Sequence, residues 1–139
     1  MTNASDIHTG ICLCGAVRFE VSGMLAEPHA CHCEQCRRQS GHFVASTHVP
    51  RSAFTLTEDR GLRWYTSSDV AQRGFCAECG TAMLWDDGGE DVYISMGCFD
   101  QPTGVRLARH IFADEKGDYY DIDDGLPAFV GFDKPLKRT

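Results

Sequence analysis

The sequence has no long apolar run, no basic N-terminal leader and no excess of basic residues. Its apolar stretches all fall short of the roughly 18 residues that a membrane-spanning helix needs, so we expect no insertion into a membrane. The first ten residues, MTNASDIHTG, have neither a basic start nor an apolar segment, which argues against a secretory signal peptide. We therefore expect a cytoplasmic protein.

Basic residues are outnumbered by acidic ones. The chain has 13 Lys and Arg against 20 Asp and Glu, which gives a net charge of −7. Between Asp114 and Asp124, six carboxylates accompany one lysine, and this stretch is typical of a solvated face or loop. Binding to a nucleic-acid backbone depends on clustered Lys and Arg, so no nucleic-acid partner is expected.

No linker or low-complexity tract divides the 139 residues, a length that suits one domain with a core of its own. In residues 15–23, Val17, Phe19 and Val21 alternate with polar residues, which predicts a half-buried strand. Further strands are expected over residues 42–49, 53–57, 62–66, 81–85, 91–96 and 108–112. Many short strands between turn residues indicate an all-β fold, with a brief helical turn over residues 34–39.

Eight cysteines need an explanation in a chain of this kind. They occur as C-x-C, C-x-C-x2-C and C-x2-C, with Cys98 alone. Structural disulfides are disfavoured in a reducing compartment. Because a metal ion draws thiolates to within about 2.3 Å of itself, tight clusters of this kind favour metal binding.

Two of the cysteine pairs are followed directly by glycine. Gly15 follows Cys12 and Cys14, and Gly80 follows Cys76 and Cys79. A backbone that curls around one ion often needs a positive φ after the second cysteine, which glycine adopts at little cost. These four cysteines are therefore predicted to form one closed, tetrahedral, structural zinc site.

Cys31, Cys33 and Cys36 remain as a set of three. A fourth ligand could come from Cys98, from one of three histidines, or from no protein group. The three histidines are His29, His32 and His42. Catalytic zinc keeps three protein ligands and one exchangeable position, so we favour a site whose fourth position is left for substrate. Cys98 is then a buried apolar residue, and His32 points away from the metal and supports the site from outside the ligand shell.

The order of these motifs closely resembles the glutathione-dependent formaldehyde-activating enzyme family, which includes the domain of centromere protein V. The resemblance rests on GICLCGAVRFEVSG, CHCEQCRRQSG, GFCAECGTAMLW, SMGCFDQP and the segment from RHIF to YDIDDGLPAF. It covers about residues 10–129 and leaves a C-terminal tail from about residue 133. Tyr119 departs from the family pattern, in which many members have Trp.

The resemblance implies a β-tent fold with rubredoxin-type zinc knuckles, in a single zinc-binding domain over residues 1–139. It also implies two zinc ions, a structural one at the four-cysteine set and a catalytic one at Cys31, Cys33 and Cys36. The implied activity is that of a carbon–sulfur lyase in formaldehyde detoxification. Such an enzyme joins glutathione and formaldehyde to give S-(hydroxymethyl)glutathione.

Zinc held by three thiolates is a weak Lewis acid, so activation of a thiol is favoured over hydrolysis. Arg37 and Arg38 follow the three cysteines directly, and either could hold a glutathione carboxylate. Two other functions stay open at this point. One is a non-catalytic zinc-binding interaction module, and the other is a redox sensor whose three cysteines lose zinc on oxidation.

Overall fold

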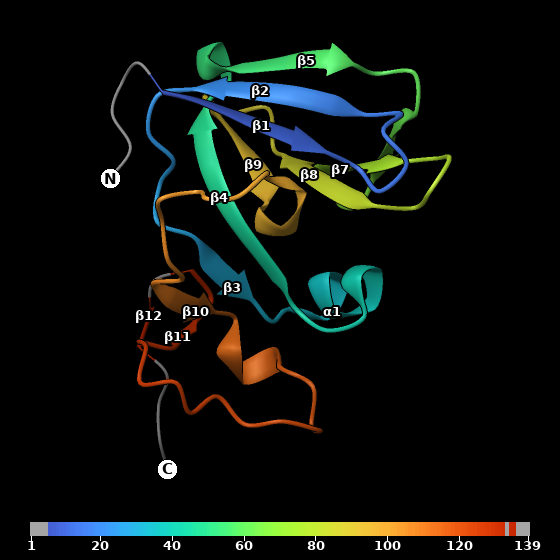
Figure 1. The fold of residues 1–139 in the computed structure, drawn as a ribbon. Coiled ribbons are helices and arrows are strands. Elements are labelled where there is room, and N and C mark those ends of the chain that lie inside the picture. The colour runs from blue at the N-terminus through green and yellow to red at the C-terminus, as the bar shows by residue number, and fades with distance from the viewer. Residues whose placement is uncertain (1–5, 133, 136–139) are drawn as a thin grey trace. The chain divides into compact units, whose positions relative to one another are not determined.

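The computed structural model describes residues 6–132 and 134–135, which form mostly short β-strands with one α-helix (Figure 1). The strands are β1 (Ile7–Ile11), β2 (Arg18–Ser22), β3 (His29–Cys31), β4 (Val44–Pro50), β5 (Phe54–Glu58), β6 (Leu62–Thr66), β7 (Gln72–Cys76), β8 (Ala82–Asp86), β9 (Asp91–Ser95), β10 (Arg109–Ile111), β11 (Phe129–Val130) and β12 (Lys134–Pro135). The helix α1 spans Glu34–Ser40. The prediction of a mainly β fold is confirmed, whereas the β-tent and zinc-knuckle description stays a prediction.

The described residues form two compact units. The first comprises the chain up to residue 26 together with 47–105, and contains the strand orders β1-β2-β5 and β9-β8-β7-β6. The second comprises 27–46 and the chain from 106 onward, and contains β10, β3 and residues 44–46 of β4, in that order, and the pair β11-β12. That all 139 residues fold as one domain stays a prediction.

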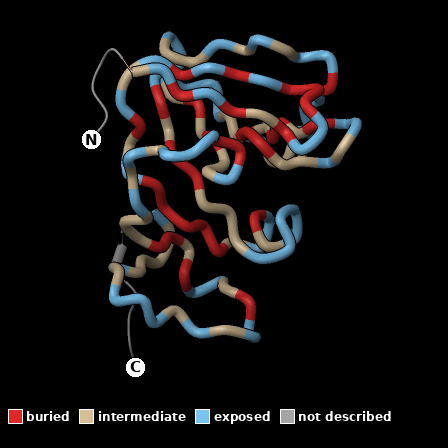
Figure 2. The backbone as a smooth tube through the Cα atoms, viewed as in Figure 1, coloured by how far each residue is buried: buried red, intermediate tan, exposed pale blue. Residues whose placement is uncertain are grey.

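The core of the first unit follows from alternation along its strands. In β2, Phe19 and Val21 are buried while Arg18, Glu20 and Ser22 are exposed, because successive side chains in a strand point to opposite faces. Buried and exposed segments alternate along the backbone (Figure 2). The Phe19 ring contacts Phe54 and Phe99, with ring centroids 5.5 and 5.3 Å apart. This aromatic cluster joins β2, β5 and the chain after β9 in one apolar core.

Strands with clear alternation lie close to their predicted positions, and strands without it were missed. Residues 62–66 form β6 as expected, and the predicted helical turn at 34–39 is α1. The sequence did not predict β1, β3 or β7. Gly74 interrupts the apolar pattern of β7, yet it fits there because a Cβ atom would approach the Leu84 side chain and the Trp64 ring to about 3.1 Å.

In the second unit, α1 is flanked by the cap residues Cys33 and Gly41. Cys33 is the N-cap residue, and Gly41 ends the helix at φ 89° with its N–H donating to the Arg37 carbonyl. Strand β3 pairs in parallel with β10, which places Ile111 opposite Cys31. The three cysteines therefore lie where a strand passes directly into a helix.

None of the helices in the described part of the chain has the length and apolar character of a membrane-spanning helix. The predicted tail from about residue 133 lies mostly outside the described residues. Only Lys134 and Pro135 of that tail are described, as β12 paired with β11.

We predict that Gly10→Ala destabilises the first unit. A Cβ atom at residue 10 would overlap the Phe19 ring, and relieving such an overlap in a packed core costs about 1–3 kcal/mol. Urea unfolding measures the change. Gly97→Ala is the matched control, because a Cβ atom there meets nothing within 4 Å. Equal stability of the two variants would contradict the packing described for Phe19.

Candidate metal centres

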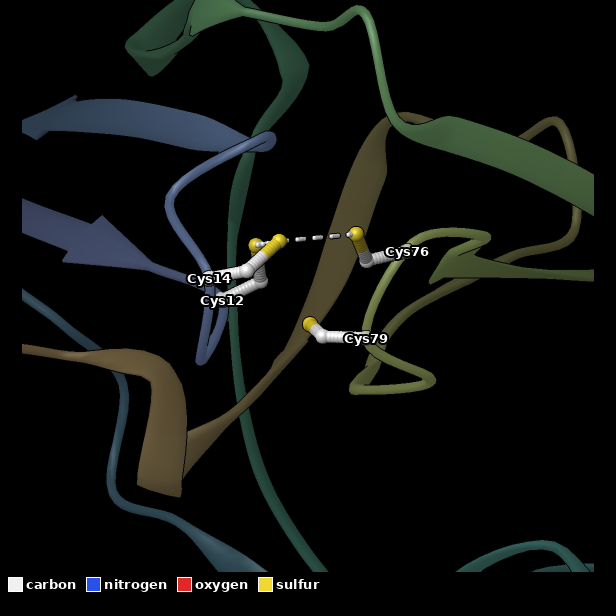
Figure 3. A group of neighbouring side chains, drawn as sticks. All are labelled: Cys12, Cys14, Cys76 and Cys79. Atoms are coloured by element: carbon white, nitrogen blue, oxygen red, sulfur yellow. Dashed lines mark hydrogen bonds between the residues drawn. The ribbon is translucent and has the colours of Figure 1, made fainter.

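Four cysteine sulfur atoms of the first unit converge from two hairpin turns (Figure 3). The sulfurs of Cys12, Cys14, Cys76 and Cys79 all lie within 4.8 Å of one another. The Cys12–Cys14 and Cys14–Cys76 distances are both 3.8 Å. Four sulfurs at about 2.3 Å from a tetrahedral zinc ion are separated by about 3.8 Å, so this group has the size that a zinc–tetrathiolate site requires.

Both turns close through glycine, as the sequence predicted. Gly15 and Gly80 have φ values of 89° and 83°. Each donates its N–H to the carbonyl of the first cysteine of its pair, at 3.3 Å for Cys12 and 2.7 Å for Cys76. A side chain at either glycine would be strained in this left-handed conformation, so the turn geometry explains why glycine occupies both positions.

Hydrogen bonds distribute charge unevenly among the four sulfurs. The Thr81 hydroxyl lies 3.2 Å from the Cys79 sulfur and lowers the pKa of Cys79 to about 5. For Cys14, the Ala16 backbone N–H lowers the pKa, but burial and the three neighbouring thiols outweigh it and raise the pKa to about 12. The neighbouring thiols thus hinder the ionisation of Cys14, whereas the pKa values of Cys12 and Cys79 are lowered. A cation among the four sulfurs would favour the thiolate form of all of them.

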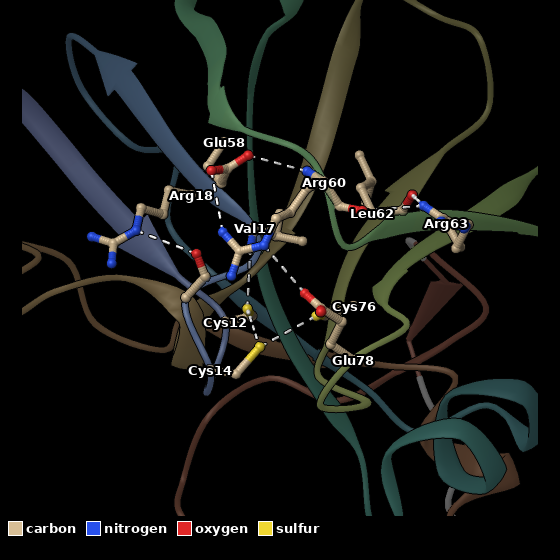
Figure 4. A network of polar contacts seen from close by, with 11 residues as sticks. Cys12, Cys14, Val17, Arg18, Glu58, Arg60, Leu62, Arg63, Cys76 and Glu78 are labelled. Atoms are coloured by element: carbon tan, nitrogen blue, oxygen red, sulfur yellow. Dashed lines mark hydrogen bonds and ion pairs between the residues drawn. The ribbon is translucent and has the colours of Figure 1, made fainter.

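Arginine side chains tie both turns to the surrounding strands (Figure 4). Arg18 donates to the Gly15 carbonyl in the first turn. Arg60 pairs with Glu58 and with Glu78, which lies between the two cysteines of the second turn. These ion pairs are solvent-exposed, so each contributes only about 0–1 kcal/mol and restrains the turns without determining the fold.

The second group, Cys31, Cys33 and Cys36, lies at the β3–α1 junction, with its sulfurs within 4.8 Å of one another. Cys31 ends β3, and Cys33 caps α1 by accepting the Cys36 N–H at 3.4 Å. This bond satisfies one of the free N–H groups of the first helical turn. The same backbone geometry therefore begins the helix and brings the sulfurs together.

Cys31 and Cys36 are buried beside Ile111, with Phe112 packed against them. The thiols of Cys33 and Cys36, together with burial, raise the pKa of Cys31 far above its ordinary value. A cation among the three sulfurs would reverse this shift. Phe112 adopts φ 52°, a left-handed conformation that is rare for a bulky residue.

The proposed extra ligands lie outside both groups. Within the described residues, the cysteine groups include neither Cys98 nor any histidine. Cys98 is buried, which raises its pKa to about 12, and its sulfur lies 3.8 Å from the Ala82 carbonyl. His29 contacts Ser46, and His42 contacts Tyr119. The assignment of zinc ligands itself stays a prediction.

His32 lies between two of the cysteines but is engaged elsewhere. Its imidazole hydrogen-bonds Tyr120 at Nδ1 and His110 at Nε2, and His110 contacts Asp124. Burial, followed by the charges of His110, His42 and Lys116, lowers the pKa of His32 to about 4. Sequence analysis did not find His110, Tyr120 or Asp124, because residues 78 to 92 positions from His32 share no local pattern with it.

The two candidate arginines differ in their surroundings. Arg38 pairs with Glu34 one helical turn away, at 3.4 Å, with both side chains largely exposed. Arg37 is half-buried, and its Nε is buried without a hydrogen-bond partner among the described residues. Because residues four apart share a helix face, Arg37 lies one turn from Cys33 on the side of the three-cysteine group.

Comparison with known proteins identifies the family of this chain. A family model described as "Glutathione-dependent formaldehyde-activating enzyme" matches residues 7–115, and the chain belongs to this family. A Schizosaccharomyces pombe protein described as an uncharacterized lyase is 30% identical over 128 residues, which cover 88% of this chain and 90% of that protein. The crystal structure of a Rhodobacter sphaeroides protein matches with a TM-score of 0.59 and 23% identity, covering 69% of this chain and 91% of that one, and so supports the fold.

We predict that the Cys76→Ser and Cys98→Ser variants differ in metal content, because Cys76 is a predicted zinc ligand and Cys98 is predicted to be a buried apolar residue. Cys76→Ser should lose one metal equivalent and lower solubility, because an ion bound by the four cysteines would join turns 62 residues apart. Cys98→Ser should keep all metal, with at most a modest packing cost. Elemental analysis of the purified variants measures the metal. Loss of one equivalent from Cys98→Ser would overturn the division into four and three.

Proposed function

We propose that this protein is a zinc-dependent carbon–sulfur lyase that joins a thiol to formaldehyde and separates the adduct again. Glutathione is the proposed thiol, and S-(hydroxymethyl)glutathione is the product. Family membership supports this reaction class. The observation that carries the proposal is the group of only three converging sulfurs, which leaves one position of a tetrahedral ion for substrate.

The two groups would hold zinc in different roles. Cys12, Cys14, Cys76 and Cys79 offer a full set of ligands and would hold a structural ion. Cys31, Cys33 and Cys36 would hold the second. Zinc bound there would favour the deprotonated form of a thiol that binds at its fourth position.

The reaction itself needs little from the protein. The thiolate sulfur forms a bond to the carbonyl carbon, the C=O π electrons move to oxygen, and the oxygen takes up the proton that the thiol gave up. No electrons are exchanged with a third partner. The task of the protein is then to orient the thiol beside the aldehyde, which raises the effective concentration of the two reactants.

Recognition of glutathione requires a cation for its carboxylates. We assign this role to Arg37 rather than Arg38. The Arg38 charge is already paired with Glu34, whereas the Arg37 guanidinium keeps a buried unpartnered donor beside the cysteine group. A planar fork of donors suits a carboxylate better than a point charge does.

We predict that the protein accelerates exchange between formaldehyde, glutathione and their adduct, and that Cys33→Ser abolishes it. Serine still caps α1, so the helix should persist while the thiolate is lost. Exchange NMR at equilibrium is the measurement, because the uncatalysed reaction is fast. Cys98→Ser is the control and should retain the rate. A wild-type rate equal to that of buffer with free zinc, for every thiol tried, would reject the enzyme in favour of a binding module.

A second prediction separates the two arginines. Arg37→Ala should raise the KM for glutathione roughly 10-fold or more, because a hydrogen bond to a charged group contributes about 1.5–3 kcal/mol. Arg38→Ala should leave the KM within about twofold. With a small uncharged thiol, both variants should match the wild type. If the Arg37 effect persists with the uncharged thiol, Arg37 does not recognise a carboxylate.

A further inference from the structure

Four side chains of the second unit form one continuous line of hydrogen bonds. It runs from the Tyr120 hydroxyl to Nδ1 of His32, from Nε2 of His32 to Nδ1 of His110 at 2.8 Å, and from Nε2 of His110 to the Asp124 carboxylate at 2.8 Å. His32 and His110 are only 1% and 4% exposed. A buried polar network in which every member is satisfied is rigid and costly to interrupt.

The Asp124 carboxylate at one end determines which atom donates and which accepts in each hydrogen bond of the line. The Leu126 backbone N–H and His110 hold the pKa of Asp124 below its ordinary value. The Asp124 carboxylate therefore accepts a hydrogen bond from Nε2 of His110. With both imidazoles neutral, each has one donor and one acceptor nitrogen. His110 then accepts at Nδ1 from His32, and His32 accepts at Nδ1 from Tyr120. Every ring nitrogen in the line is satisfied.

This line passes through His32, the residue that separates two of the three clustered cysteines. His32 follows Cys31 and precedes Cys33, and its backbone N–H donates to the Ile111 carbonyl at 3.1 Å. His32 is thus held at its backbone and at both ring nitrogens. Because neighbouring side chains of an extended segment point to opposite sides, fixing the imidazole on one side fixes where the cysteine sulfurs point on the other.

We propose that Asp124, His110 and Tyr120 are positioning residues, which act through His32 to hold the Cys31–Cys33 turn in its metal-binding geometry. The proposal rests on the proposed function in one respect, since it assumes that the three cysteines bind a metal ion. Groups that orient metal ligands from outside the ligand shell typically change metal affinity 10–100-fold when they are removed. None of the four side chains contributes a ligand in this proposal.

The test compares metal release from the full chain loaded with two equivalents of zinc. A chromogenic chelator reports the fast release from the three-cysteine group and the slow release from the four-cysteine group. Asp124→Ala and His110→Ala should speed the fast phase about 10-fold or more. The slow phase, which serves as an internal reference, should not change. Asp124→Asn should restore most of the wild-type rate, because its amide oxygen can still accept from His110.

Tyr120→Phe provides a milder variant in case the others fail to fold. It removes only the hydroxyl at the end of the line and should still speed the fast phase. Tyr119→Phe is the matched control, since the Tyr119 hydroxyl contacts His42 and not His32. It should release zinc as the wild type does.

The possible results are distinct. Folded Asp124→Ala, His110→Ala and Tyr120→Phe variants with a wild-type fast phase would overturn the positioning role. Equal acceleration of both phases would also overturn it, because the network would then support the whole fold. If the wild-type chain binds only the slowly released ion, the three cysteines bind no metal and the positioning role is overturned. Two tightly held ions without thiol–formaldehyde exchange would reject the enzyme and leave the positioning role intact.

Discussion

Mutual repulsion among clustered thiolates is the constraint on which the rest of this structure depends. In each group the sulfurs lie within 4.8 Å of one another, and neighbouring thiols raise the pKa of Cys14 and Cys31. Such crowding is unfavourable for ionised sulfur unless a cation lies among the ligands. The fold nevertheless places cysteine sulfurs this close together at two sites. Its turns and helix cap bring together sulfurs whose negative charge a bound metal ion would balance.

The two groups meet this constraint with different local structures. The four-cysteine group uses two turns closed by glycine, in which the Gly15 and Gly80 N–H groups donate to the carbonyls of Cys12 and Cys76. The three-cysteine group uses the beginning of a helix, where Cys33 takes the capping position usually filled by serine or aspartate. Closed turns suit an ion that holds the fold together. A strand–helix junction, with Arg37 one turn further on, suits an ion that meets a substrate.

The predictions that the structure confirms rest on local patterns in the sequence. The glycines after Cys14 and Cys79 indicated positive φ, and the alternation in β2 indicated its buried face; both are confirmed. The family resemblance, based on contiguous motifs, is confirmed as well. Strand β3 was missed because three residues are too few to show a period.

The hydrogen-bonded line through His32 could not be predicted for a different reason. Its members are brought together by the pairing of β3 with β10, which places His110 opposite Ala30. No spacing rule links positions so far apart in the chain. Likewise, the difference between Arg37 and Arg38 depends on whether Glu34 turns toward one of them, which only the folded helix reveals.

At Phe112, side-chain packing and backbone strain have opposite effects on stability. Its ring packs against Cys31 and Cys36, while its φ of 52° costs of order 1–3 kcal/mol for a residue with a side chain. Glycine would relieve the backbone but leave a void against the sulfurs, and most other residues would keep the strain without filling the space. Phe112→Gly would therefore exchange backbone strain for lost packing at the three-cysteine group.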